Sequence, residues 1–276
     1  MTRTRLAVLV LVPILLLGCT RRAPVEEPPP ATQGAAPLAL LPSATRPPSA
    51  TPLITPSATA TETSTPGPTE APPAPELDSD DPRYGLNLAA PNYLDNFSSS
   101  LTWEGPNFEG ASNIWEDGHH RATDYLADTF LWWSTTIPDI EAGNVYVEVT
   151  AETGDCAGKD AYGLALRVDP QNRSSGYMLE FSCDGAYRIR KLYGNALIVL
   201  QDWTPAGAIR SGSQATNVMG FLAVGSELSA FANEDLLATV EDTTFSSGNY
   251  GLYANAASTP GLTVTFDDFK LWYVNR

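Results

Sequence analysis

The sequence is poor in the residues that most often build metal and nucleophilic sites, with three cysteines and two histidines among 276 residues. The histidines are neighbours, His119 and His120, so their side chains diverge on a strand. No cysteine or carboxylate stands at a metal-ligand spacing with them, and no pattern ties them to a thiol. We therefore expect a solvated hairpin at residues 115–120, and neither a histidine metal centre nor a catalytic cysteine.

Basic residues are also scarce. Lysine and arginine number 16, against 32 aspartates and glutamates, and the formal net charge is −16. Such an acidic surface repels the phosphate backbone, so we exclude nucleic acid as a partner. Most of the acidic side chains are expected to serve solubility.

Long hydrophobic runs are missing as well. Leu6–Leu17 is an apolar run that would reach about 18 Å as a helix, short of the roughly 30 Å core of a bilayer. The run follows Arg3 and Arg5 and leads into L-L-G-C, which ends at Cys19. This order resembles the signal of bacterial lipoproteins, which implies that residues 1–18 are a signal peptide and that Cys19 is acylated. We expect an extracytoplasmic protein, held by lipid on a membrane or at the cell surface.

Aromatic residues are absent between residues 20 and 82, where 16 of the 23 prolines lie. Serine, threonine and alanine fill most of the rest, so the segment cannot bury enough apolar area to become ordered. We interpret residues 19–82 as the lipidated cysteine with a disordered, Pro/Thr/Ser-rich linker. Residues 83–276 then form one domain, which is long enough to bury a core.

With Cys19 assigned to lipid, Cys156 and Cys183 remain, in a compartment that favours oxidation. Cys156 lies in a polar, glycine-rich loop and Cys183 at the tip of a hairpin, outside the core. Two loop cysteines can meet at one edge of a sandwich, so we predict that they form a disulfide.

The hairpin at Gly176–Leu192 has a register that can be predicted. A two-residue loop would place apolar partners on opposite faces of the sheet. A three-residue loop, Cys183–Gly185, with Gly185 in the left-handed region, makes each cross-strand pair chemically sensible. The predicted pairs are Phe181 with Tyr187, Leu179 with Ile189, and Glu180 with Arg188.

Helical periodicity is absent from the domain, and alternation with period two recurs along it. Val145, Val147 and Val149 alternate with polar or aromatic residues, and residues 162–168 alternate in the same way. Turn signals such as Asp169-Pro170 separate these segments at the spacing of a sandwich. The pattern predicts an all-β protein with two packed antiparallel sheets.

Several short motifs follow one another along the domain in a characteristic order. They are Leu94-Asp95-Asn96-Phe97 with Trp103, Tyr162-Gly163-Leu164 with Arg167, Gly176-Tyr177 with Asp184-Gly185, and Phe266-Asp267-Asp268-Phe269. In this order the chain resembles the laminin-G-like, concanavalin A-like jelly rolls of bacterial envelope proteins and, more distantly, 3-keto-disaccharide hydrolase domains. The resemblance implies a scaffold shared by lectins, carbohydrate-binding modules, adhesion domains and some glycoside hydrolases.

Paired carboxylates for glycoside hydrolysis are not found in the sequence, although a glycosidase needs two that face each other across the sugar. We therefore expect no catalysis and no required cofactor, and we predict a lectin-like lipoprotein that binds a glycan or another surface ligand. Two alternatives stay open. One is a structural or protein-interaction module of the envelope, and the other is a hydrolase of the 3-keto-disaccharide type.

Exposed aromatic residues are the expected mark of a sugar site. The candidates are Trp115, Trp132, Trp133 and Tyr193. The resemblance places Trp103, Trp203 and one of Trp132 and Trp133 in the core.

The resemblance also implies a candidate structural Ca²⁺ site, with Asp95 near Asp267 or Asp268 if the two ends of the domain lie side by side. The alternative is that one of the late aspartates caps a β-bulge between Phe266 and Phe269.

Overall fold

The computed structural model describes residues 77–99, 103–104, 108–126, 131–135, 143–171, 173–194 and 196–276, and gives only the backbone for Glu104 and for residues 131–135. The described residues form strands, turns and loops, and no helix. None of them belongs to a helix that is long and apolar enough to cross a membrane. The predicted signal peptide, Cys19 and the linker up to residue 76 lie outside the described residues.

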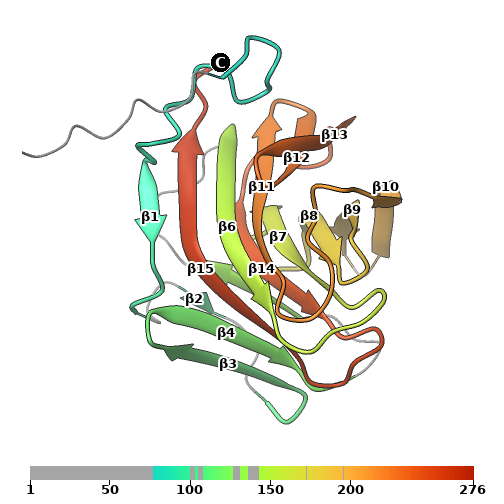
Figure 1. Ribbon diagram of the computed structural model, residues 1–276. Coiled ribbons are helices and arrows are strands. Elements are labelled where there is room, and N and C mark those ends of the chain that lie inside the picture. Colours follow the sequence, from blue (N-terminus) through green and yellow to red (C-terminus); the bar gives the residue numbers. More distant parts are fainter. Residues whose placement is uncertain are drawn as a thin grey trace, which may run out of the picture. The chain divides into compact units, whose positions relative to one another are not determined.

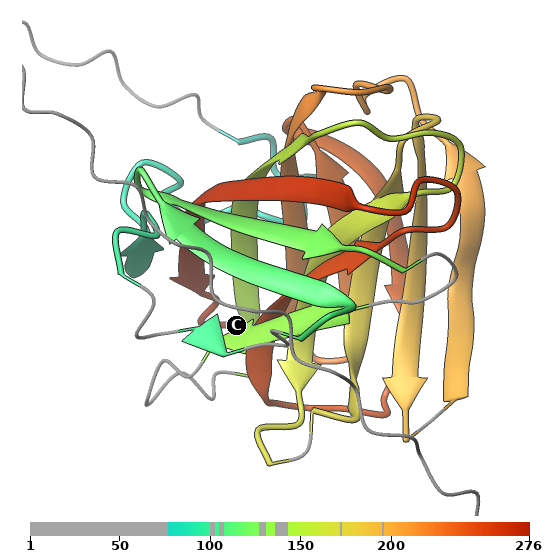
Figure 2. The same ribbon diagram turned by 90° about the horizontal axis from the view of Figure 1, so that it is seen from below.

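The strands form two antiparallel sheets that pack face to face (Figures 1 and 2). In spatial order, sheet A consists of β13 (Asp235–Glu241), β12 (Glu227–Ala232), β11 (Thr216–Val224), β6 (Val145–Thr153), β15 (Leu262–Tyr273), β4 (His119–Asp124) and β3 (Ala111–Glu116), and β1 (Tyr93–Asp95) also pairs with β15. Sheet B consists of β10 (Ala196–Pro205), β9 (Ala186–Tyr193), β8 (Ser175–Ser182), β7 (Ala161–Val168), β14 (Asn249–Asn255), β5 (Leu131–Thr135) and β2 (Trp103–Glu104). This is the predicted all-β sandwich.

The side chains that the predicted alternation points inward form the core between the two sheets. Val145, Val147 and Val149 of β6 are fully buried and pack with residues of β7 such as Leu164 and Leu166. Removing this apolar surface from water stabilises the sandwich.

The alternation fails at the end of β7. Val168 was expected to face inward like Leu166, but it packs in a separate cluster on the outer face of sheet B. The cause is a bulge, because Arg167 has a positive φ of 52° and the β7–β14 register shifts between Asn249 and Gly251. One extra residue in a strand turns the next side chain to the other face.

The predicted β8–β9 register is confirmed. Phe181 pairs with Tyr187, Leu179 with Ile189, and Glu180 with Arg188. Gly185 has a φ of +81° and its N–H donates to the Ser182 carbonyl at 2.9 Å. The three-residue loop is therefore the one that makes every cross-strand pair compatible.

Residues 77–92 run over the outer face of sheet A, where Leu86 and Leu88 pack against a cluster that includes Phe231 and Trp272. Residues 77–82, expected to belong to the linker, include Asp81, which bonds to Arg83 at 2.7 Å. The guanidinium of Arg83 is buried and lies 4.2 Å from the centroid of the Phe231 ring. We call residues 77–92 the strap.

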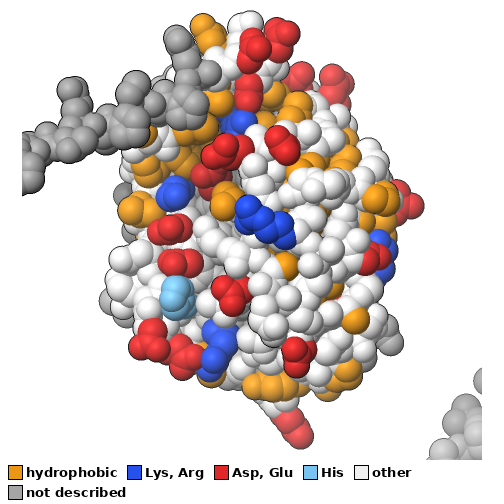
Figure 3. Space-filling view, in the orientation of Figure 1, with side chains coloured by type: hydrophobic (Ala, Val, Ile, Leu, Met, Phe, Trp, Pro, Cys, Tyr) orange, Lys and Arg blue, Asp and Glu red, His pale blue; other side chains and the backbone are white. Residues whose placement is uncertain are grey.

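The visible face in Figure 3 is that of sheet A, with β6, β15 and β11 in front as in Figure 1. Acidic side chains are spread over this face, with fewer basic ones between them. This agrees with the acidic composition and indicates no cationic surface here for a polyanion.

Candidate functional site

The predicted aromatic platform cannot be assessed at Trp132 and Trp133. Their backbone lies in β5, where Trp132 pairs with Tyr253 and Trp133 with Leu252. Their side chains lie outside the part of the chain that the structure describes.

Trp115 is half-buried and not a free platform. Its ring stacks on the imidazole of His120, with centroids 4.7 Å apart and an angle of 7° between the planes. The solvated hairpin was therefore the wrong interpretation for His120, which is fully buried, whereas His119 stays 43 % exposed. Burial lowers the pKa of His120 to about 3, so its ring is neutral.

Of the two predicted candidates whose side chains are described, Tyr193 is more accessible than Trp115, at 60 % exposure. It ends β9 and its ring centroid lies 6.1 Å from that of Phe245. The edge strand β10 follows it, with exposed Leu197, Ile198 and Val199.

Two of the three aspartates predicted to hold Ca²⁺, Asp95 and Asp267, have other partners. Asp95 accepts hydrogen bonds from the Trp103 indole at 3.0 Å and from the Phe97 N–H at 2.8 Å. Asp267 accepts the N–H of Asp268 at 2.7 Å, at a register shift of β15. The bulge-capping alternative is thus what the geometry shows. Among the described residues, no group of three or more histidine, cysteine, aspartate and glutamate side chains could hold a metal ion.

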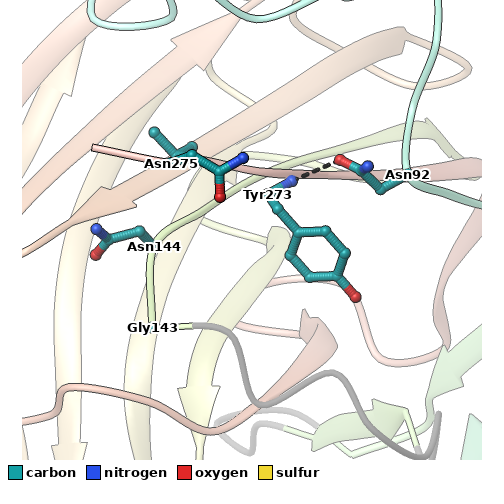
Figure 4. Close-up of a pocket in the computed structure, with 6 residues that line it drawn as sticks. Asn92, Gly143, Asn144, Tyr273 and Asn275 are labelled. Carbon is teal, nitrogen blue, oxygen red and sulfur yellow. Dashed lines mark hydrogen bonds between the residues drawn. The ribbon is translucent and has the colours of Figure 1, made fainter.

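A pocket of about 520 Å³ lies where the strap, the start of β6 and the end of β15 meet, and its described lining residues carry no charged side chain. Its described lining consists of Asn92, Gly143, Asn144, Tyr273, Val274 and Asn275. In the view of Figure 4, the Asn275 amide lies above the Tyr273 ring, and Asn92 and Asn144 lie to either side. We call this the amide pocket.

Hydrogen bonds fix two of these asparagines. Asn92 accepts the Tyr273 N–H at 2.8 Å, as the dashed line in Figure 4 marks. Asn144 accepts the Gly225 N–H at 2.9 Å and donates to the Arg276 carbonyl at 2.7 Å. Their remaining amide hydrogens have no partner among the described residues, so they can serve a ligand.

Arg167 supports the floor of the amide pocket from inside the domain. Its guanidinium is buried and donates to the carbonyl of Gly143 at 2.6 and 3.1 Å, and to the carbonyls of Gly225 and Phe245. Burial lowers its pKa. Because its partners are three separate loop carbonyls, Arg167 holds these loops together without a carboxylate.

The outer face of sheet B carries a buried charge cluster, formed by Glu180, Arg188 and Arg190. The Glu180 carboxylate is fully buried and accepts from Arg188 Nε at 2.6 Å and from Arg190 Nη2. Arg190 Nη2 also donates to the Tyr253 hydroxyl at 3.0 Å. Burial raises the pKa of Tyr253, and the Glu180 charge adds to this effect.

A glycine makes room for this cluster. Gly163 of β7 pairs with Tyr253 of the neighbouring strand β14 on one side and with Glu180 of β8 on the other. A Cβ at Gly163 would collide with the backbone carbonyl of Leu179. The strand is therefore restricted to glycine at this position.

Trp203 lies beside the charge cluster and not in the core between the sheets. Arg188 Cζ is 4.2 Å from its ring centroid and Lys159 Nζ is 4.8 Å away. The core position expected from the resemblance was wrong, because β10 shifts register between Gln201 and Thr204 and presents Trp203 to the outer face.

The predicted disulfide is confirmed. Cys156 and Cys183 are bonded, with their Cα atoms 6.0 Å apart. Cys183 is at the hairpin tip but, contrary to expectation, it is buried, because the loops before β7 and before β11 cover it. Lys159 of the first loop reaches Asp184 of the tip at 2.9 Å.

The amide pocket and Trp203 were missed in the sequence. Asparagines at strand ends are common turn residues, so Asn92, Asn144 and Asn275 carried no signal by themselves. The chain ends that bring them together are far apart in sequence. For Trp203, the predicted pair Glu180–Arg188 was a signal, since a charged pair on a strand marks the outer face of the sheet.

No family model matches the chain, and no curated protein sequence matches it. Among solved structures, a native glycosidic hydrolase superposes with a TM-score of 0.50 at 11 % identity, over 66 % of this chain and 96 % of the other. The carbohydrate-binding module CBM66 from Bacillus subtilis gives 0.49 at 16 % identity, over 62 % and 95 %. A Bacillus licheniformis β-glucanase gives 0.49 at 9 %, over 67 % and 98 %. Such low identities concern the fold alone. The described domain is a two-sheet antiparallel jelly roll of the concanavalin A-like kind.

Proposed function

We propose that this chain is a non-catalytic glycan-binding module, anchored by lipid at Cys19 on the outside of a membrane. The amide pocket carries the proposal. Its volume falls within the range of about 300–1,000 Å³ that is usual for small-ligand sites. Amide groups of asparagine both donate and accept hydrogen bonds, and an aromatic ring offers an apolar face, which together match the hydroxyls and C–H face of a sugar.

The absence of ionisable carboxylates from the described lining favours binding over hydrolysis. Glycoside hydrolysis uses a proton donor and a second carboxylate about 5–10 Å apart. On the outer face of sheet B, the Glu180 carboxylate is occupied by two guanidinium groups. Among the described residues, neither place therefore offers the hydrolase alternative a carboxylate pair.

A protein-interaction role is the second candidate, and the edge strand β10 favours it. Leu197, Ile198 and Val199 are 37–49 % exposed in succession at the edge of sheet B. Exposed apolar edge strands pair readily with other chains. This role predicts binding to an envelope protein and no affinity for free sugars.

The test is binding of the full-length chain to a panel of neutral polysaccharides and oligosaccharides, with titration calorimetry on any that bind. Asn275→Ala removes an exposed amide from the amide pocket, and we expect it to weaken binding about ten-fold, equivalent to about 1.4 kcal/mol. Asn96→Ala removes an exposed asparagine elsewhere and should have no effect. Absence of neutral-glycan binding, or equal affinity for both variants, would contradict the proposal.

A further inference from the structure

The charge cluster on the outer face of sheet B is not electrically balanced. One carboxylate, Glu180, faces two guanidinium groups, those of Arg188 and Arg190, which leaves one positive charge in excess. The site is nearly dry, because Glu180 is fully buried and the side chain of Arg190 is 10 % exposed. An unbalanced charge in such surroundings is costly unless an anion accompanies it.

The donors of the cluster are also incompletely used. Arg188 donates only its Nε–H to Glu180, and neither of its Nη groups has a hydrogen-bond partner among the described residues. Arg190 Nε is buried and has no partner either. A guanidinium has five N–H donors arranged as a planar fork that matches a carboxylate.

The Trp203 ring packs against this fork. Arg188 Cζ lies 4.2 Å from the ring centroid, Lys159 Nζ lies 4.8 Å from it, and the ring is half-buried. The side chain of Arg188 keeps 16 % exposure, so this end of the cluster is reached from solvent. A cationic fork and an indole thus lie together on one patch, and Lys159, paired with Asp184 at 2.9 Å, borders it.

The disulfide holds this patch in shape. It ties the loop that carries Lys159 to the tip of the hairpin that carries Arg188. Two backbone bonds add to it, from Cys183 N–H to the Asp160 carbonyl at 2.9 Å and from Asp184 N–H to the Gly158 carbonyl at 3.0 Å. A preorganised site loses less entropy when it binds.

We infer that Arg188, Trp203 and Lys159 form a second binding site, distinct from the amide pocket, for an acidic sugar of the hexuronate class. The carboxylate of the sugar bonds to the free Nη edge of Arg188 and neutralises the excess charge of the cluster. The C–H face of the sugar ring packs on the exposed part of Trp203, which Arg188 leaves uncovered. Lys159, paired with Asp184, lies at the edge of the site and can donate a further hydrogen bond to the sugar.

The probes are matched pairs of oligosaccharides: oligogalacturonate, oligoguluronate and hyaluronan fragments, each beside its fully methyl-esterified form. Titration calorimetry of the full-length chain is expected to detect at least one of the acids, with its ester binding at least ten-fold more weakly. Raising the salt concentration should weaken binding of the acid and leave that of the ester unchanged.

Substitutions at Arg188 and Trp203 locate the site. Arg188→Gln is expected to weaken binding of the acid at least ten-fold, and Trp203→Leu should weaken it several-fold while leaving the ion pairs of Glu180 in place. Arg121→Gln removes an arginine that is paired with Glu116 on sheet A and should have no effect. If Arg188→Gln fails to fold, Trp203→Leu and Arg188→Lys, which keeps the charge but loses the fork, decide the matter.

Acids that do not bind, esters that bind equally well, or Trp203→Leu and Arg188→Lys variants with unchanged affinity would each overturn this inference. The Asn275→Ala variant separates the two sites. It should leave hexuronate binding unchanged, so either site can fail its test while the other passes.

Discussion

The buried side chain of His120 should make the stability of the domain depend on pH. Its pKa is held near 3 by burial, well below the value of about 6.5 expected in the unfolded chain. Between these values the unfolded chain binds a proton that the folded domain does not, so the free energy of unfolding falls as pH falls. We expect a loss of about 1 kcal/mol between pH 7.0 and 5.5, measured by urea unfolding.

Substitution of the buried ring tests this link. His120→Phe should flatten this pH dependence whatever its effect on stability at pH 7. Arg121→Gln, which changes an exposed side chain on the same strand, should leave the slope in place. An unchanged slope in His120→Phe would show that other groups cause the loss.

At the scale of elements, the sequence was sufficient where neighbours along the chain decide the structure. The β8–β9 hairpin is such a case, because only one loop length puts Phe181 against Tyr187 and Glu180 against Arg188. It was insufficient for Val168, where the bulge depends on pairing with β14, a strand distant in sequence.

The candidate sites differ in the same way, because some of their features depend on local sequence and others on contacts between distant segments. Tyr193 is exposed, as a sugar-binding aromatic residue would be, but its role in binding stays a prediction. His120 was misjudged because its burial comes from Trp115, Phe97 and Trp103, and two of these rings lie outside its hairpin. The amide pocket could not be predicted, because it exists only once the strap meets the end of β15.

The disulfide joins the β8–β9 hairpin to the loop before β7, so we expect its removal to destabilise the folded domain. It closes a loop with a sequence separation of 27, for which the chain-entropy model gives about 3.5 kcal/mol. Cys156→Ser with Cys183→Ser should therefore lower the free energy of unfolding by about that amount. Reduction of the unchanged protein should give a similar loss, and reduction of the double variant none.

For the whole molecule, the proposed lipid at Cys19 leads to a prediction about where the protein resides. If this thiol is acylated, Cys19→Ser should move the chain from the detergent phase to the aqueous phase in detergent partition and abolish incorporation of labelled palmitate. Thr20→Ala, one position later, should keep both properties. A Cys19→Ser chain that stays in the detergent phase would refute lipid anchoring through this residue.

The two ends of the described domain lie close together, which suits the domain to insertion into other proteins. Arg276 donates hydrogen bonds to the carbonyls of Pro82 and Tyr84, so the chain enters and leaves the sandwich at the same place. Domains with adjacent ends can replace a surface loop of another protein, or be circularly permuted, without being pulled apart. Residues 77–276 are thus suited to serve as an insertable cassette that displays the outer face of sheet B on a foreign scaffold.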